Sequence, residues 1–150
     1  MIDYTLLNKQ LDALLTGETN RTGMLANAAA LLMQTGGWFW IGFYLVEGEE
    51  LCLGPFQGTV ACYRIGYGKG VCGTAWSERR SLVVPDVEEF PGHIACSSLS
   101  RSEIVVPIFA GETIVGVLDI DSTETDTFTE ADRIGLEAFC AILSKRVFAR

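Results

Sequence analysis

The segment "EIVVPIFAGETIVGVLDID", residues 103–121, contains two apolar runs on either side of Gly111-Glu112. Both runs are rich in isoleucine and valine, which favour extended strands, and a two-residue break containing glycine is typical of a tight hairpin. The segment therefore predicts two neighbouring antiparallel strands. Because hairpin strands need no helical crossover between them, it also favours a mainly antiparallel sheet.

Segments before and after this hairpin predict the rest of the fold. Leucine and alanine recur at helical spacing within residues 7–15 and 25–32, and Thr129 can cap a final helix. Further strands are expected at residues 38–46, 51–56, 59–65 and 81–87, a short helix at 71–80 and an irregular segment at 88–101. The predicted fold class is α+β: a central, mainly antiparallel sheet of about six strands, with the N- and C-terminal helices on one face and a ligand pocket on the other.

The composition is that of one globular domain over residues 1–150. Hydrophobic residues make up 49% of the chain, but no apolar run approaches the roughly 18 residues that span a bilayer. The first residues lack the basic region and the cleavage site of a signal peptide. A net charge of -8 repels polyphosphate and anionic lipid, so we expect no nucleic acid and no membrane as partners. These features predict a cytoplasmic protein.

Five cysteines, an odd number in a chain without an export signal, argue against a secreted disulfide scaffold. Reactive thiols are favoured at helix starts and in polar, partly exposed loops. Cys96, in the polar segment "GHIACSSLSR", is best placed to be a nucleophile, Cys72 lies at an expected helix start, and Cys62 borders an expected strand. Cys52 and Cys140 lie in apolar surroundings and are interpreted as small buried residues.

The segment "VACYRIGYGKGVCG", residues 60–73, raises the question of a phosphate or metal site. A P-loop needs lysine directly before serine or threonine at the start of a long helix, whereas Lys69 precedes Gly70. The potential zinc ligands in and beyond the segment are Cys62, Cys72, His93 and Cys96. One pair among them has the short spacing usual in structural zinc sites. We expect neither phosphate nor metal, and interpret the glycines as residues that allow a close backbone approach.

One face of the hairpin ends in carboxylates. Period-two alternation places Val115, Asp119 and Asp121 on the same face of the second strand, which favours a pocket lined by the two acids. Clustered carboxylates attract a cationic amino group and raise one another's pKa, so that an acid can stay protonated near neutrality. Trp40 and Tyr44, at even spacing along an earlier strand, can line the same pocket or belong to the core.

Glu103, at the start of the first hairpin strand, is a third candidate for this cluster. A regular two-residue turn at Gly111-Glu112 would pair Glu103 with Ile120, on the opposite face. Either a bulge, for which Pro107 is the candidate, or a longer loop is needed to bring Glu103 beside Asp119.

Five segments together closely resemble one known family: "WIGFYL", "LGPFQGTVACYRI", "GKGVCGTAW", "GHIACSSLSRSEIVVPI" and "GVLDIDS". The chain is similar, from about residue 20 onward, to the free methionine-R-sulfoxide reductases, which are built on the GAF fold. The resemblance implies an oxidoreductase that reduces the R epimer of free methionine sulfoxide, a product of oxidative stress.

The same resemblance implies roles for individual residues. It implies Cys96 as the catalytic cysteine, Cys62 as the principal resolving cysteine and Cys72 as a third family cysteine. The substrate-binding residues that it implies are Glu103, Asp119, Asp121 and Trp40. The oxidised Cys96 would condense with a second thiol, and an external dithiol such as thioredoxin would restore the enzyme, with no bound cofactor. Backbone N–H groups of the glycine-rich segment or the Cys96 segment are expected to hold the substrate carboxylate.

The alternative interpretation is a non-catalytic GAF module that senses a small molecule or a redox state. Such modules are commonly fused to an output domain, for which 150 residues leave no room. A sensing pocket also has no need of two thiols that can meet, so Cys62 and Cys96 favour the enzyme. The sequence leaves open whether Cys62 or Cys72 reacts first and whether the chain forms a homodimer. Closure of a disulfide across these segments predicts movement of the Cys96 segment between redox states.

Overall fold

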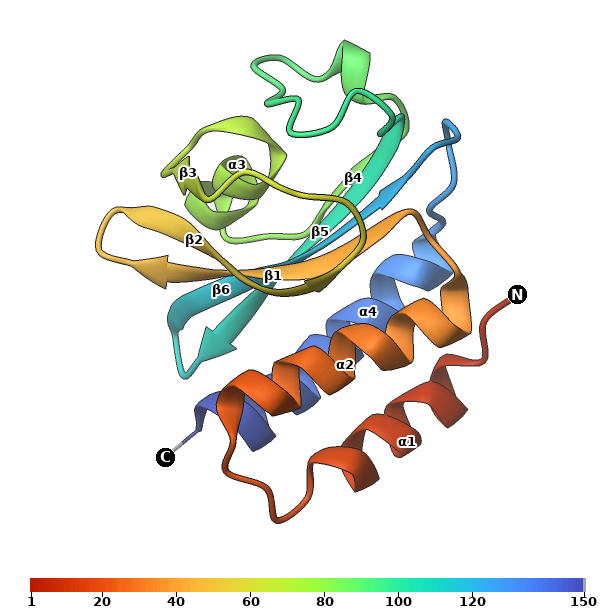
Figure 1. Ribbon diagram of the computed structural model, residues 1–150, viewed down its shortest axis with the longest axis vertical. Helices are drawn as coiled ribbons and strands as arrows, with labels where there is room; N and C mark the ends of the chain where they lie inside the picture. Colours follow the sequence, from red (N-terminus) through yellow and green to blue (C-terminus); the bar gives the residue numbers. More distant parts are fainter. Residues whose placement is uncertain (150) are drawn as a thin grey trace.

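The computed structural model describes residues 1–149. Within this range, six strands form one antiparallel sheet in the order β3-β2-β1-β6-β5-β4 (Figure 1). The strands are β1 (Trp40–Glu47), β2 (Glu50–Gln57), β3 (Arg64–Gly66), β4 (Leu82–Val84), β5 (Ser102–Ala110) and β6 (Thr113–Ser122). The helices are α1 (Tyr4–Leu15), α2 (Arg21–Gly36), α3 (Gly70–Glu78) and α4 (Glu130–Leu143), with the short helical turns η1 (Val87–Glu89) and η2 (Ser144–Phe148). The predicted α+β class and the antiparallel sheet are confirmed.

The helices α1, α2 and α4 cover one face of the sheet (Figure 1). The side chains of Asp3 and Asn20 cap α1 and α2, each accepting a backbone N–H of the first turn. Thr129 caps α4 in a reciprocal arrangement, because its hydroxyl accepts the N–H of Asp132 and the Asp132 carboxylate accepts the N–H of Thr129. These caps satisfy N–H groups that have no partner within the helix, and the predicted start of the last helix is confirmed.

A large apolar cluster fills the space between these helices and the sheet. Leu7, Leu11 and Leu15 of α1 recur at helical spacing, and Leu118 and Ile120 of β6 point to the same cluster; each is at most 1% exposed. Full burial of a side chain of this size contributes about 1.5–3 kcal/mol to stability. This cluster therefore holds the fold together and leaves the opposite face of the sheet for a binding site.

A smaller apolar cluster lies on that opposite face. It contains Trp40 and Tyr44 of β1, Val71 of α3, Val105 of β5 and Val117 of β6. The short helix α3 and the loops around it cover this part of the sheet (Figure 1). The pocket face is thus walled by connections between strands and not by long helices.

The β5–β6 hairpin turns at Gly111-Glu112 as predicted, because Ala110 pairs directly with Thr113. Gly111 has a φ of 64°, a left-handed conformation that glycine adopts at no steric cost. The turn therefore has the two-residue length that the sequence indicates.

A β-bulge interrupts this hairpin. The register shifts between Ile108 and Phe109, and Val115 is the extra residue on β6. Pro107, the candidate proposed from the sequence, keeps a regular partner, so the predicted position of the bulge is wrong. Val115 packs against the helix-side cluster. Simple alternation of side chains along β6 would place it on the pocket face instead. The extra residue explains the difference, because residues on the two sides of a bulge no longer follow one common alternation.

The bulge decides where the acids of the hairpin lie. Beyond it, Glu103 pairs with Asp121 and not with Ile120. Without the extra residue, Glu103 would point toward the helices. The bulge therefore brings Glu103 onto the face that carries Asp119 and Asp121.

The sequence predicts a strand from Thr59 onward. In the structure a loop connects β2 to β3, and β3 has only three residues. Two aromatic side chains of β1 hold this loop. The indole N–H of Trp40 donates to the Thr59 carbonyl at 2.9 Å, and the Tyr44 hydroxyl donates to the Cys62 carbonyl at 3.0 Å. The loop backbone thus finds side-chain partners in place of a neighbouring strand, which the local sequence pattern does not reveal.

The glycine-rich segment lets the backbone of α3 lie in direct contact with the backbone that follows β3. A Cβ atom on Gly73 would lie 2.4 Å from the carbonyl oxygen of Gly66, and the N–H of Gly68 donates to the Gly73 carbonyl at 3.0 Å. The interpretation of these glycines as residues that permit close backbone approach is confirmed. Among residues 1–149, no helix combines the length and the apolar character that crossing a bilayer requires.

Candidate active site

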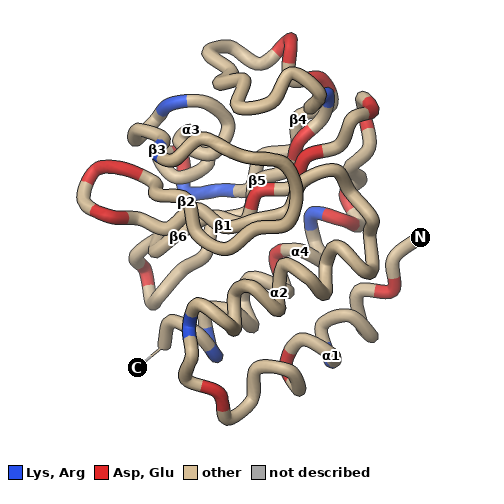
Figure 2. Tube along the Cα trace, viewed as in Figure 1, with Lys and Arg blue, Asp and Glu red and all other residues tan. Residues whose placement is uncertain are grey.

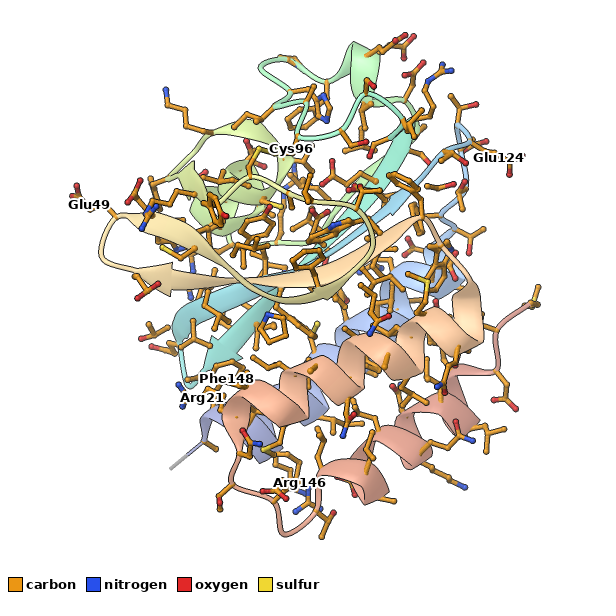
Figure 3. The ribbon with its side chains drawn as sticks, in the orientation of Figure 1. Arg21, Glu49, Cys96, Glu124, Arg146 and Phe148 are labelled. Carbon is orange, nitrogen blue, oxygen red and sulfur yellow. A yellow bond between two sulfur atoms is a disulfide. The ribbon has the colours of Figure 1, made fainter. Side chains whose placement is uncertain are left out.

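A pocket lies on the sheet face opposite α1, α2 and α4, where Cys96 is labelled in Figure 3. Its floor comes from β1, β5 and β6, and its walls come from the start of α3, the β2–β3 loop and the segment before β5. The predicted site residues that line it are Trp40, Tyr44, Cys72, Cys96, Glu103, Asp119 and Asp121. The cavity measures about 40 Å³, which is room for a few water molecules.

Three carboxyl groups form the base of the pocket. Glu103 and Asp119 are each 6% exposed, and Asp121 lies directly across from Glu103 on the neighbouring strand. Burial raises the pKa of Glu103 well above its usual range, and the charges of Asp119 and Asp121 raise it further. The directions of these shifts make Glu103 the donor and Asp119 the acceptor of the side-chain hydrogen bond between them. The cluster is therefore a proton store, because its raised pKa values let it keep protons to a higher pH than isolated carboxyl groups do.

The two aspartates have unused acceptor capacity. One carboxylate oxygen of each, Oδ1 of Asp119 and Oδ1 of Asp121, is buried without a hydrogen-bond partner among the described residues. Burial also raises the pKa of both groups, and for Asp119 hydrogen bonds from Glu103 and Cys72 oppose this rise. Buried oxygens without partners are costly unless a ligand supplies a donor, so the pocket is suited to a ligand with N–H or O–H groups.

Cys62 and Cys96 are joined by a disulfide across the mouth of the pocket. Their Cα atoms are 5.5 Å apart, although 34 residues separate them in sequence. The bond links the β2–β3 loop to the segment before β5. Cys96 lines the pocket, whereas Cys62 is not among the lining residues. The structure therefore brings the two cysteines together, and of the pair Cys96 lines the pocket.

Cys72 lies in the first turn of α3, as expected, but its surroundings differ from those of a reactive thiol. The side chain is buried, and its sulfur lies close to the carboxylates of Glu103 and Asp119. Burial raises the pKa of the Cys72 thiol well above its usual value, and the charges of the acids raise it further. Burial and the neighbouring acids raise the pKa of the Cys72 thiol by more than the helix start lowers it, which favours the neutral thiol.

The two remaining cysteines lie away from the pocket. Cys140 is buried in α4, as the sequence indicates. Cys52, interpreted from the sequence as buried, is only partly buried because it lies on β2 near the sheet edge, beside Glu47. A hydrogen bond to Glu47 raises the pKa of the Cys52 thiol, which lowers its reactivity.

Aromatic rings form one wall of the pocket. Trp40 stacks on Phe56 and on Tyr44, with ring centroids 5.2 Å and 6.1 Å apart, and both Trp40 and Tyr44 are nearly fully buried. Their polar atoms point to the β2–β3 loop. Burial, with the charge of Asp119 next, raises the pKa of Tyr44 and keeps its hydroxyl a donor. These two residues line the pocket and also hold the loop that carries Cys62.

Two pocket residues were not predicted as part of the acidic site. His93 places its Nε2 atom 3.8 Å from Oε1 of Glu103, and burial lowers the pKa of this imidazole. Ser100 is buried beside Asp121. Both lie in the polar segment around Cys96, so their proximity to Cys96 in sequence is the signal that could have identified them.

The ligand set for metal differs from the one considered from the sequence. Cys62 and Cys96 are consumed by the disulfide, which removes both thiolates. Cys72, Glu103 and Asp119 each offer a ligand atom within 4.8 Å of the others. All three are buried.

The start of α3 also lines the pocket, next to the acids, because the Cys72 sulfur lies within 4.8 Å of carboxylate oxygens of Glu103 and Asp119. Gly70, Val71 and Cys72 all line the pocket, and Lys69, the residue before the helix, supplies no side-chain cap. The first N–H groups of a helix have no partner within it and carry partial positive charge. The pocket therefore offers N–H donors suited to an anion beside its carboxyl groups.

Comparison with known proteins agrees with this geometry. The GAF domain family profile matches residues 11–147. The chain is 56% identical over 130 residues to GAF domain-containing protein A of Dictyostelium discoideum, a match covering 86% of this chain and 82% of that protein. It is 48% identical over 143 residues to the free methionine-R-sulfoxide reductase of Escherichia coli, covering 95% of this chain and 87% of that enzyme.

A solved structure shows the same arrangement of the chain. The free methionine-R-sulfoxide reductase of Neisseria meningitidis, determined in complex with its substrate, superposes with a TM-score of 0.93 at 50% identity. The match covers 95% of this chain and 87% of that chain. The fold is thus a GAF fold, and the chain belongs to the free methionine-R-sulfoxide reductase family.

Proposed function

We propose that this protein reduces free methionine (R)-sulfoxide to methionine, with Cys96 as the nucleophile. The observation that carries the proposal is the position of Cys96: it lines a pocket whose base is the protonated cluster of Glu103, Asp119 and Asp121, and it is bonded to a second cysteine. A thiol, a proton source and a partner thiol are the three components that sulfoxide reduction requires.

The reaction transfers oxygen from substrate to enzyme. The Cys96 thiolate attacks the sulfoxide sulfur while the carboxyl cluster protonates the oxygen, which weakens the sulfur–oxygen bond. The hydroxyl then passes to the Cys96 sulfur as the bond between the two sulfurs breaks, so that methionine leaves with the bonding pair and Cys96 is left as a sulfenic acid. The Cys62 thiol then attacks the Cys96 sulfur, releasing water and forming the disulfide seen here. Cys72 takes no covalent part in this scheme, since its thiol is neutral and buried.

The carboxyl groups and the start of α3 together support a preference for the free amino acid. The substrate ammonium would donate to the unpartnered oxygens of Asp119 and Asp121, and charge-assisted hydrogen bonds of this kind are stronger than neutral ones. The substrate carboxylate would lie against the first N–H groups of α3. A methionine sulfoxide within a peptide lacks both charges.

The disulfide joins two segments that border the pocket. With it in place the cavity measures about 40 Å³, room for a few waters. Reduction would release the β2–β3 loop from the segment before β5 and let the mouth widen for the substrate. The proposal therefore has the protein alternate between a wider dithiol form and a narrower disulfide form.

An external dithiol, for which thioredoxin is the proposed donor, completes the cycle by reducing the disulfide. The electrons pass between thiols alone, so the proposal needs no bound cofactor. A reducing compartment such as the cytoplasm supplies this kind of reductant.

Substrate selectivity tests the proposal. With dithiothreitol as reductant, we expect consumption of free methionine (R)-sulfoxide, none of the S epimer, and a rate at least about 100-fold lower for N-acetylmethionine (R)-sulfoxide, which lacks the ammonium group. Equal consumption of the acetylated compound would contradict the role of the two aspartates. Failure to consume any sulfoxide would favour the alternative, a GAF module that senses redox state through the same disulfide.

A further inference from the structure

The disulfide lies among neutral segments in a strongly acidic chain. The net charge is -8, yet residues 58–63 and 92–100, which carry Cys62 and Cys96, contain no aspartate, glutamate, lysine or arginine. In Figure 2 the loop between β2 and β3 is free of charged residues along its length. Removing water from neutral segments costs less than removing it from charged ones, so this part of the surface is suited to close contact with another protein.

Exposed apolar side chains surround the disulfide. Val60 is 88% exposed, Tyr63 77%, Ile94 39% and Leu99 58%; we call these four residues the collar. Each is within three residues of Cys62 or Cys96, and three residues of extended chain span about 11 Å at most. Exposed apolar groups gathered at one place mark an interaction surface, whereas scattered ones do not.

The two sulfur atoms lie in different surroundings. Cys62 and Cys96 are both partly exposed. Cys96 lines the pocket, whereas Cys62 does not line it and directly precedes Tyr63 of the collar, which is 77% exposed. A protein docked on the collar therefore reaches Cys62 without entering the pocket, and access of this kind decides which sulfur is attacked.

We propose that the collar is the docking surface for a dithiol protein of the thioredoxin type, which attacks the sulfur of Cys62. This inference rests on the proposed function, in which the disulfide is reduced in every cycle. The reductant thiolate bonds to Cys62, the Cys62–Cys96 bond breaks, and Cys96 leaves as a thiolate. The second thiolate of the reductant then attacks its own partner sulfur, releasing Cys62 as a thiolate and the reductant as a disulfide.

This order has a mechanistic consequence. Cys96 is restored as a thiolate inside the pocket by the first exchange step, while Cys62 still holds the reductant outside. The nucleophile is therefore never bonded to the bulky partner, and the acidic base of the pocket stays undisturbed during recycling.

Trapping the mixed disulfide tests which sulfur is attacked. The oxidised wild-type protein is mixed with a thioredoxin whose second active-site cysteine is replaced by serine, the mixture is quenched with acid and alkylated, and the joined peptides are identified by mass spectrometry. The expected adduct joins thioredoxin to Cys62. An adduct on Cys96 would overturn the proposal, as would the absence of any adduct, the result expected if a second copy of this chain covered the collar.

Collar variants test the docking surface. We expect Tyr63→Ser and Leu99→Ser to lower kcat/KM for thioredoxin by about tenfold, since truncation at the centre of an interface is costly, with turnover driven by dithiothreitol unchanged. The matched controls are Leu6→Ser and Ile134→Ser, which remove side chains 53% and 57% exposed on α1 and α4. Equal loss with both reductants, or no loss with thioredoxin, would refute the collar. Failure of wild type with dithiothreitol would instead refute the proposed function, so the two failures are distinguishable.

Discussion

The three carboxyl groups of the pocket show how burial changes the pKa of individual residues. Glu103, Asp119 and Asp121 lie together where water is excluded, so a shared proton costs less than three negative charges. The same arrangement leaves acceptor oxygens on both aspartates for a ligand. The cluster can thus bind a cation and supply a proton.

Glu103→Gln is expected to lower kcat/KM by about 100-fold or more, because a positioned acid contributes about that factor. The raised pKa of the wild-type cluster should produce an alkaline limb on which activity falls as the protons are lost. Glutamine at position 103 does not titrate, so the part of the alkaline limb that Glu103 contributes should be lost from the variant's profile. The control is Glu112→Gln on the exposed hairpin turn. Identical pH profiles for wild type and Glu103→Gln would contradict a role for Glu103 in the proton store.

Asp121→Asn is expected to stabilise the protein at alkaline pH. The pKa of Asp121 is raised on folding above its ordinary value of 3.8, mainly by burial and then by Asp119. The folded state therefore binds the proton more tightly than the unfolded state, and stability falls as pH rises from that ordinary value through the raised one. A tenfold difference in proton affinity between the two states corresponds to about 1.4 kcal/mol of stability. Thermal unfolding is measured at about pH 5 and at about pH 8, and the fall in Tm between the two should be smaller in the variant than in wild type. An equal or larger fall would show that deprotonation of Asp121 does not destabilise the folded protein.

At the scale of elements, the pocket depends on two irregularities that flank regular strands. The bulge at Val115 aligns Glu103 with Asp121 across the hairpin, and the β2–β3 loop carries Cys62 to Cys96. Neither continues the sheet, yet each positions a residue of the site.

Tyr44→Phe is expected to loosen the β2–β3 loop. The variant removes one hydroxyl and with it the 3.0 Å hydrogen bond to the Cys62 carbonyl, while the ring keeps its place in the pocket wall. We expect a loss of about 1 kcal/mol of stability and a several-fold slower closure of the disulfide after methionine release. Trapping the sulfenic acid with dimedone during a single turnover measures this delay. A closure rate equal to that of wild type would show that the bond does not position Cys62.

These two irregularities also mark where sequence-based prediction stopped. The hairpin turn, the terminal helices and the shared face of Asp119 and Asp121 follow from local patterns of two or three residues. The loop in place of a strand depends on hydrogen bonds from Trp40 and Tyr44, which lie elsewhere in the chain. The bulge places Val115 against the helix-side cluster, a contact that local alternation does not reveal. The raised pKa of Cys72 depends on acids brought to it only by folding.

At the scale of the whole molecule, the residues that stabilise the fold and the residues of the candidate site lie on opposite faces of one sheet. The helix face buries the large apolar cluster, and the pocket face carries the thiols and the acids beneath short connections (Figures 1 and 3). Short connections can move without unfolding the core. In the proposed cycle, this division would let the mouth of the pocket move while the sheet stays fixed.

A single turnover with thiol counting tests the central claim, that Cys96 receives the oxygen and Cys62 closes the disulfide. The reduced protein is freed of reductant and mixed with methionine (R)-sulfoxide, and then both the methionine released and the remaining thiols are measured. Wild type and the control Cys140→Ser should each release one methionine per chain and lose two thiols; Cys62→Ser should release one methionine, and Cys96→Ser none. Release of one methionine by Cys96→Ser would contradict the account.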